Sequence, residues 1–199
     1  MEQNQKLVYF HGFNSEYNPE SNKIKELSVL GEVYGITYDT TMPYYDVCSF
    51  LREELSRRKL TDAIYVGTSL GGFWASKMAS LFGNPSIIMN PCYDPGNMLK
   101  KYVGIVHNHV SGEEKEFSSK TVESYEGRKL QDFKFDFLPL LLLDENDAIL
   151  DSSTTQKVLS SLPNVFFTGG SHRFNHTNQA LQHISAYISR CSFVEQMNT

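Results

Sequence analysis

The residues best suited to chemistry lie in three short segments, each of which follows an apolar run. Ser69 stands in the stretch Gly67-Thr68-Ser69-Leu70-Gly71, while Asp147 and His172 follow two later apolar runs. A serine hydroxyl becomes an effective nucleophile when a histidine takes its proton and a carboxylate orients that histidine. The residue types and their order along the chain therefore predict acyl-transfer chemistry.

The serine segment has the pattern Gly-x-Ser-x-Gly between an apolar run and a helical pattern. In such a nucleophile elbow the turn is so tight that a side chain at either glycine would clash with neighbouring backbone. The turn lifts the hydroxyl clear of the sheet, at a helix N-terminus whose dipole favours developing negative charge. A plain glycine turn is the alternative, and the strand–turn–helix context favours the elbow.

Nearby residues offer alternatives for the acid and the base. Asp94, in the loop after the preceding strand, is a second candidate for the acid, and His176, at the start of the last helix, is a second candidate for the base. Asp144 lies at a strand end, where it could simply be solvated. Asp147 lies further into its loop, and His172 follows a Gly-Gly turn that lets the loop dip toward the serine. We therefore prefer Asp147 and His172.

Two backbone N–H groups are expected to stabilise an oxyanion. A His-Gly pair after the first strand marks the loop that supplies one donor, and the residue after the nucleophile supplies the other. We assign these donors to Phe13 and Leu70. Asn14, in the same loop, and Tyr93 are expected to line the substrate pocket. His11 is expected to hold the loop by a hydrogen bond.

A pair of histidines, His107 and His109, raises the question of a metal site. Two histidines at this spacing need at least one more ligand, and no spaced cysteine or carboxylate set accompanies them. A solvated loop is therefore preferred. The glycines near Ser69 lack the lysine of a phosphate-binding loop and the spacing of a dinucleotide fingerprint. We predict neither a metal nor an organic cofactor.

Short apolar runs alternate with longer segments at helical spacing, which predicts an α/β fold with about six mostly parallel strands and helices on both faces. The expected strands are Leu7–Phe10, Val33–Tyr38, Ala63–Val66, Ser86–Met89, Leu138–Leu143 and Val165–Thr168. The expected helices are Pro19–Leu30, Tyr44–Leu60, Leu70–Leu81, Ser152–Leu162 and His176–Ile188. Residues 91–136 show no convincing strand and are expected to form a short helical or loop insertion, like a cap, before the strand that carries the acid.

The bulk composition limits the possible functions. A chain of 199 residues is expected to form one domain, residues 1–199. Its formal net charge of −5 argues against nucleic-acid binding. No apolar run is long enough to span a membrane, and the first residues lack a secretory pattern. Three widely spaced cysteines favour a reducing cytoplasm over a disulfide framework.

Several motifs together resemble the small YqiA-like bacterial esterases of the α/β-hydrolase superfamily. These motifs are HGFNS, GTSLGGFWAS, IIMNP, NDAILD and GGSHRF, and the similarity runs over essentially the whole chain. The resemblance implies a compact hydrolase with little lid that acts on short-chain carboxylic esters, with Ser69, Asp147 and His172 as its triad. The segment Val103–Phe117 departs from the family pattern.

The sequence therefore predicts a serine hydrolase of the carboxylesterase type that acts on a small-molecule ester. A thioesterase or deacylase acting on a carrier- or protein-linked acyl group is one alternative. A non-catalytic binding module on the same fold is another. Because a free imidazole titrates near pH ~6.5, activity is expected to fall in acid.

Overall fold

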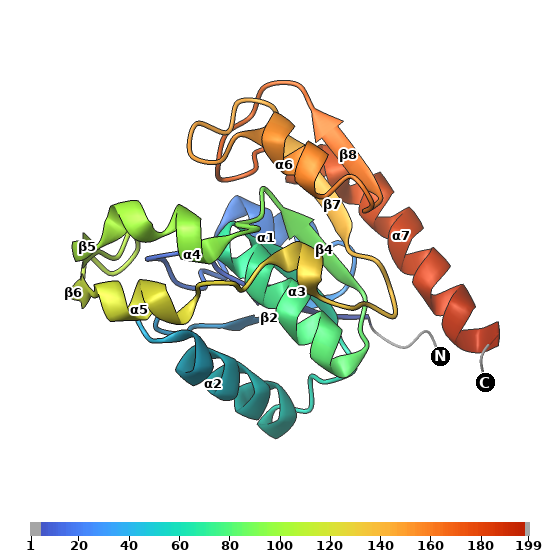
Figure 1. The fold of residues 1–199 in the computed structure, drawn as a ribbon. Helices are drawn as coiled ribbons and strands as arrows, with labels where there is room; N and C mark the ends of the chain where they lie inside the picture. Colours follow the sequence, from blue (N-terminus) through green and yellow to red (C-terminus); the bar gives the residue numbers. More distant parts are fainter. Residues whose placement is uncertain (1–4, 198–199) are drawn as a thin grey trace.

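The computed structural model describes residues 5–197, and its centre is a parallel sheet of six strands (Figure 1). The order across the sheet is β2-β1-β3-β4-β7-β8. These strands are β1 (Lys6–Phe10), β2 (Glu32–Ile36), β3 (Ile64–Thr68), β4 (Ser86–Met89), β7 (Leu140–Asp144) and β8 (Asn164–Phe167). All six strands expected from the apolar runs are confirmed, with small shifts at their ends.

Helices follow the strands as the helical spacing predicts. They are α1 (Asn22–Leu27), α2 (Tyr44–Arg57), α3 (Leu70–Phe82), α4 (Pro95–Met98), α5 (Ser119–Ser124), α6 (Ser152–Val158) and α7 (Thr177–Met197). Side chains cap several of them: Ser21 accepts a hydrogen bond from Ile24 N–H at the start of α1, and Asp151 accepts one from Thr154 N–H at the start of α6. Such caps satisfy N–H groups that have no partner within the helix.

Both faces of the sheet are covered. Along β1, Val8 and Phe10 join the core formed with α2 and α3, whereas Leu7 and Tyr9 join the core formed with α1 and α7. Successive side chains of a strand point to opposite faces, so a strand covered on both sides must be apolar throughout. This burial leaves the carboxyl ends of the strands as the edge of the sheet where polar side chains gather.

The prediction of no strand within residues 91–136 is wrong. This segment contains a two-stranded antiparallel hairpin, β5 (Gly104–His107) and β6 (Glu114–Phe117), between α4 and α5. In Figure 1 the hairpin lies beside α5, at the end of the molecule away from α7. The pattern was too weak to predict strands because the hairpin buries only two of its side chains, Val106 and Phe117.

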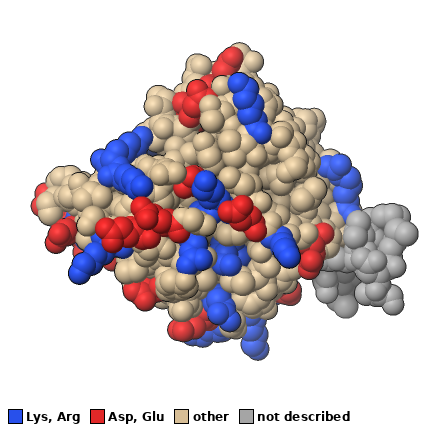
Figure 2. All heavy atoms as spheres, viewed as in Figure 1, with Lys and Arg blue, Asp and Glu red and all other residues tan. Residues whose placement is uncertain are grey.

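The surface carries both signs of charge. On the face seen in Figure 2, Lys and Arg side chains lie among Asp and Glu side chains, so neither sign dominates that face. None of the helices within residues 5–197 combines the length and the apolar character needed to cross a membrane.

Candidate active site

Ser69 joins β3 to α3 with a strained backbone. Its φ is 57° and its ψ is −124°, a conformation that costs a non-glycine residue on the order of 1–3 kcal/mol. The neighbouring strand β4 and the residues after it hold this turn from both sides. Ser69 N–H donates to the Met89 carbonyl at 3.0 Å, and the Ser69 carbonyl accepts from Cys92 N–H at 2.9 Å. The strain therefore persists because the sheet fixes the backbone.

The two glycines that flank Ser69 have no room for a side chain, as the sequence pattern predicts. A Cβ atom on Gly67 would lie 2.1 Å from the Gly71 carbonyl oxygen. A Cβ atom on Gly71 would lie 2.0 Å from the Phe10 carbonyl oxygen. Both obstacles are backbone atoms that cannot rotate away, so glycine is required at both positions.

A chain of hydrogen bonds joins Ser69, His172 and Asp147. His172 Nε2 lies 2.9 Å from Ser69 Oγ, and His172 Nδ1 lies 2.9 Å from each carboxylate oxygen of Asp147. A carboxylate only accepts, so Nδ1 carries the proton and Nε2 is free to accept from the serine hydroxyl. The three residues come from the loops that follow β3, β7 and β8, so the serine is far from the other two in the chain.

The carboxylate of Asp147 is held in place from its own loop. Its side chain is 1% exposed, and Oδ1 accepts from the backbone N–H groups of Ile149 and Leu150 at 2.8 and 2.9 Å. Charge-assisted hydrogen bonds of this kind compensate a buried carboxylate for the water that it loses. The carboxylate is thus fixed with both oxygens 2.9 Å from His172 Nδ1.

The alternative acid and base have other partners. Asp94 caps α4 and bonds to the backbone and side chain of Asn97. His176 pairs with Asp144, with 2.7 Å between His176 Nδ1 and Asp144 Oδ1. The expectation that Asp144 could simply be solvated is wrong, because its side chain is fully buried. It is buried because the loop that carries His172 folds over the end of β7.

The loop after β1 passes beside the serine. A Cβ atom on Gly12 would lie 3.5 Å from Ser69 Cβ, so the backbone at this point passes close to the nucleophile. Leu70 is the first residue of α3, where N–H groups have no partner within the helix. Phe13 and Leu70 remain the predicted oxyanion donors.

His11 fixes this loop by hydrogen bonds and ring stacking. Its Nδ1 donates to the Gly12 carbonyl at 2.9 Å, and its Nε2 accepts from Tyr38 N–H at 3.2 Å. Its ring also stacks on the Tyr38 ring, with 4.2 Å between centroids. Burial lowers the pKa of His11 to about 4, so the ring is neutral in this arrangement.

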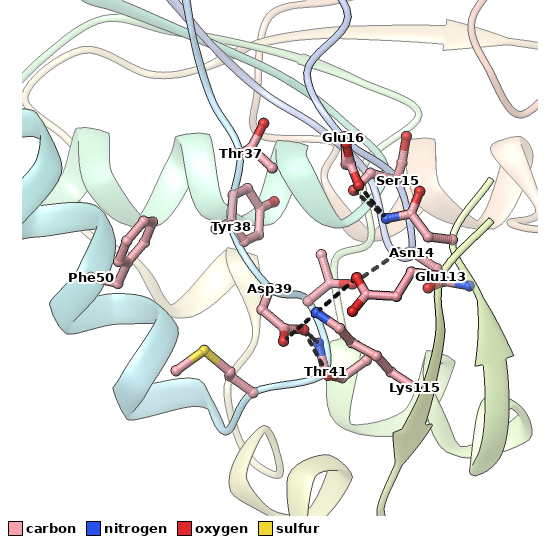
Figure 3. A pocket seen from close by; sticks show the side chains of 13 residues that line it. Asn14, Ser15, Glu16, Thr37, Tyr38, Asp39, Thr41, Phe50, Glu113 and Lys115 are labelled. Carbon is pink, nitrogen blue, oxygen red and sulfur yellow. Dashed lines mark hydrogen bonds and ion pairs between the residues drawn. The ribbon is translucent and has the colours of Figure 1, made fainter. Parts of the chain in front are cut away.

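A cavity of about 300 Å³ lies at the ends of β1 and β2, and neither Ser69, Asp147 nor His172 lines it (Figure 3). Lys115 of the hairpin reaches into it and lies 3.0 Å from Asp39 Oδ2 and 3.3 Å from Glu113 Oε2. Asn14 lines this cavity, and its amide donates to the His107 carbonyl of the hairpin. Tyr93 does not line it; its side chain packs half-buried against the core. Asn14 and Tyr93 therefore do not share one pocket wall here.

Within residues 5–197, no three histidine, cysteine, aspartate or glutamate side chains form a group that could hold a metal ion. His107, one of the two histidines considered above, lies 3.2 Å from Glu114 of the partner strand, and the other, His109, is exposed.

Asn90 is a residue of the site that the sequence reasoning missed. Its Oδ1 accepts from Asp144 N–H at 2.9 Å, and its Nδ2 donates to the Ser171 carbonyl at 2.8 Å and to the His172 carbonyl at 3.3 Å. It follows directly on the apolar strand β4. A single asparagine at the carboxyl end of a buried strand was the signal that could have found it.

A parallel sheet with helices on both faces and a strained serine between β3 and α3 defines the α/β-hydrolase fold. Solved structures with a similar fold support this assignment. Est1E from Butyrivibrio proteoclasticus superposes with a TM-score of 0.72 at 15% identity, over 100% of this chain and 90% of that protein. A monoacylglycerol lipase from Paleococcus ferrophilus gives a TM-score of 0.67 at 13% identity, over 92% of this chain and 93% of that one.

The chain belongs to the uncharacterised protein family UPF0227, whose family model matches residues 6–189. Two relatives are similar over nearly their whole length. A UPF0227 protein from Pasteurella multocida is 28% identical over 190 residues, covering 92% of this chain and 99% of that protein. One from Vibrio vulnificus is 26% identical over 186 residues, covering 91% and 97%. These matches confirm the resemblance to the YqiA-like group that the motifs indicated.

Proposed function

We propose that this protein is a serine hydrolase of the carboxylesterase type, with Ser69 as nucleophile, His172 as general base and Asp147 as the acid that orients the base. The observation that carries this proposal is the unbroken hydrogen-bond chain from Ser69 Oγ through His172 to Asp147. The strained turn and the helix N-terminus at Ser69 add to it, because both are expected where a tetrahedral oxyanion must be stabilised.

In the proposed reaction His172 Nε2 takes the proton of Ser69 as Oγ attacks the ester carbonyl. The negative charge that develops on the carbonyl oxygen is stabilised by the N–H groups of Phe13 and Leu70. His172 then gives its proton to the leaving alcohol, and the C–O bond of the ester breaks. A water molecule, activated by the same histidine, attacks the acyl-enzyme and releases the acid. Asp147 stabilises the imidazolium in both halves of the reaction.

Esters are the proposed substrates because the similar structures include an esterase domain from Rhodothermus marinus. Another similar structure is Est1E with ferulic acid bound. At these low identities the likeness concerns the fold, so the acyl group of this protein's substrate must be found by assay.

A fluorophosphonate probe tests the proposal directly, because it reacts covalently only with an activated serine. We expect wild-type protein to be labelled at Ser69 and the Ser69→Ala and His172→Ala variants to lose at least about 10³-fold in labelling rate. Ser189→Ala, which changes an exposed serine on α7, is the matched control and should be labelled normally. A folded wild-type protein that stays unlabelled would refute the assigned nucleophile and favour a non-catalytic binding module.

Assays with matched esters and thioesters test the proposed substrate class. Activated esters with two to eight acyl carbons, each paired with the thioester of the same acyl group, separate an esterase from a thioesterase with one protein. We expect short-chain esters to give the highest kcat/KM. A preference of more than about tenfold for every thioester would instead identify a thioesterase or deacylase.

A further inference from the structure

A second carboxylate–imidazole pair lies next to the proposed triad. Asp144 is three residues before Asp147, and His176 is four residues after His172. The two pairs come from the same two loops, but only His172 reaches Ser69. The function of the pair of Asp144 and His176 is therefore not explained by the proposed reaction itself.

The carboxylate of Asp144 is hydrogen-bonded by the loop that carries His172, and the Lys23 ammonium of α1 interacts with it electrostatically. Its Oδ1 lies 2.7 Å from His176 Nδ1, and its Oδ2 accepts from Ser171 N–H at 3.0 Å and from Asn175 N–H at 2.7 Å. These backbone donors lie on either side of His172. Because a buried carboxylate needs such donors to remain charged, the loop and Asp144 depend on each other.

Side chains from outside the loop also donate hydrogen bonds to its carbonyl groups. Asn90 donates to the carbonyls of Ser171 and His172, and Lys23 donates to the carbonyl of Arg173. The loop fits closely, since a Cβ atom on Gly170 would lie 2.0 Å from Asp144 Oδ2. The position of His172 is thus set by contacts with β4, β7 and α1 rather than by the loop alone.

The loop makes two sharp turns in the left-handed region, which its glycines adopt freely and Phe174 adopts at a cost. Gly169 and Gly170 have φ values of 84° and 75°, and Phe174 has a φ of 57°. His176 is fixed in turn by stacking on Phe167, with 5.2 Å between centroids and 9° between the ring planes. An imidazole that shifts by about 1 Å from its productive position can lose about 10²-fold in rate.

We propose that Asp144, charged and paired with His176, is a positioning residue that places His172 against Ser69. The proposal rests on the proposed function of Ser69 and His172. Asp147 contacts the base directly and orients its ring, whereas Asp144 contacts the backbone and sets where that ring stands. In Asp144→Asn, an NH2 group replaces one of the two acceptor oxygens and the negative charge is lost, so the amide presents a donor either to the backbone N–H groups or to His176 and holds the loop less tightly.

The kinetic test compares Asp144→Asn with Asp151→Asn, which changes a carboxylate that follows the same strand but caps α6 and does not contact the loop. We expect Asp144→Asn to lower kcat for an activated ester by about 10–100-fold with KM changed less than about twofold, and to lower the labelling rate equally. Asp151→Asn should change neither. Equal rates in wild type and Asp144→Asn would overturn the proposal.

A milder pair of variants keeps the test decisive if Asp144→Asn does not fold. His176→Leu removes the donor to Asp144, whereas His176→Asn keeps an N–H donor close to the position of Nδ1. We expect kcat to fall in the first variant and to be largely restored in the second. Similar kcat values in the two variants would overturn the proposal.

The low-field proton NMR signal of His172 Nδ1–H reports its position without any turnover. We expect wild type and Asp151→Asn to share this signal, and Asp144→Asn and His176→Leu to shift or lose it while circular dichroism stays native. An unchanged signal in both variants would refute positioning. The signal also separates the two proposals, because it reports the loop even if the probe fails to label wild-type protein.

Discussion

His11 makes a quantitative prediction about the acid stability of this fold. Its ring is 2% exposed and accepts a hydrogen bond from Tyr38 N–H through Nε2. A proton on Nε2 would face that N–H group with another donor, and the buried charge would lack solvent. Burial lowers the pKa of His11 to about 4 in the folded protein, whereas an unfolded chain binds this proton near pH ~6.5.

The sign of the effect follows from the number of protons bound in each state. Between about pH 6.5 and pH 4 the unfolded chain holds the proton of His11 and the folded protein does not, so the free energy of unfolding falls as the pH is lowered. With these two pKa values, His11 alone should remove about 2 kcal/mol between pH 7.5 and pH 5. The whole effect is complete only below pH 4.

His11→Gln tests this prediction, because the amide oxygen of glutamine can accept from Tyr38 N–H but takes up no proton in this range. Urea unfolding at about pH 7.5 and pH 5 gives the free energy of unfolding of each variant. We expect the wild type to lose about 2 kcal/mol more on acidification than His11→Gln. His109→Gln, at an exposed histidine, should behave like wild type. An equal loss in wild type and His11→Gln would refute the reasoning.

Two further predictions concern the support of the site. Gly67→Ala places a Cβ atom 2.1 Å from a backbone oxygen, so urea unfolding should show a loss of about 3 kcal/mol or more, whereas Gly12→Ala, with 3.5 Å to its nearest neighbour, should keep most of its stability. Phe117→Ala removes a fully buried ring that packs on Phe13 at 4.8 Å, and should lose about 3–5 kcal/mol. The exposed hairpin residue Val110 is its control, and Val110→Ala should lose less than about 0.5 kcal/mol. A loss below about 1 kcal/mol for Gly67→Ala or Phe117→Ala would contradict the packing argument.

The central sheet was predictable because its strands are buried on both faces. Each strand then reads as a continuous apolar run, and the polar residues that follow mark the carboxyl ends where a site must lie. Ser69, Asp147 and His172 were chosen in this way, and the structure brings their side chains within 2.9 Å of one another along the chain of contacts.

The hairpin was not predictable in the same way. A two-stranded sheet at one end of the molecule buries few side chains, so β6 reads Glu-Lys-Glu-Phe with only Phe117 in the core. Nothing in such a segment distinguishes a strand from a solvated loop. The cavity beside the hairpin was equally hidden, because its walls come from the loops after β1 and β2, from α2 and from the hairpin, which are distant in the chain.

The sequence by itself determined the order of the elements and the local geometry of the elbow, since both follow from contacts between near neighbours: apolar periodicity and glycines at fixed spacing around Ser69. The sequence also favoured Asp147 and His172 from their places in the two loops, and only the tertiary structure shows what the neighbouring Asp144 and His176 contact. Asp144 and Asp147 are three residues apart in the chain, and His172 and His176 are four residues apart. Residue type alone therefore does not show which member of each pair joins the hydrogen-bond chain to Ser69. Their contacts differ because Asn90 and Asp144 hold the loop so that His172 faces Ser69 and His176 faces the buried Asp144.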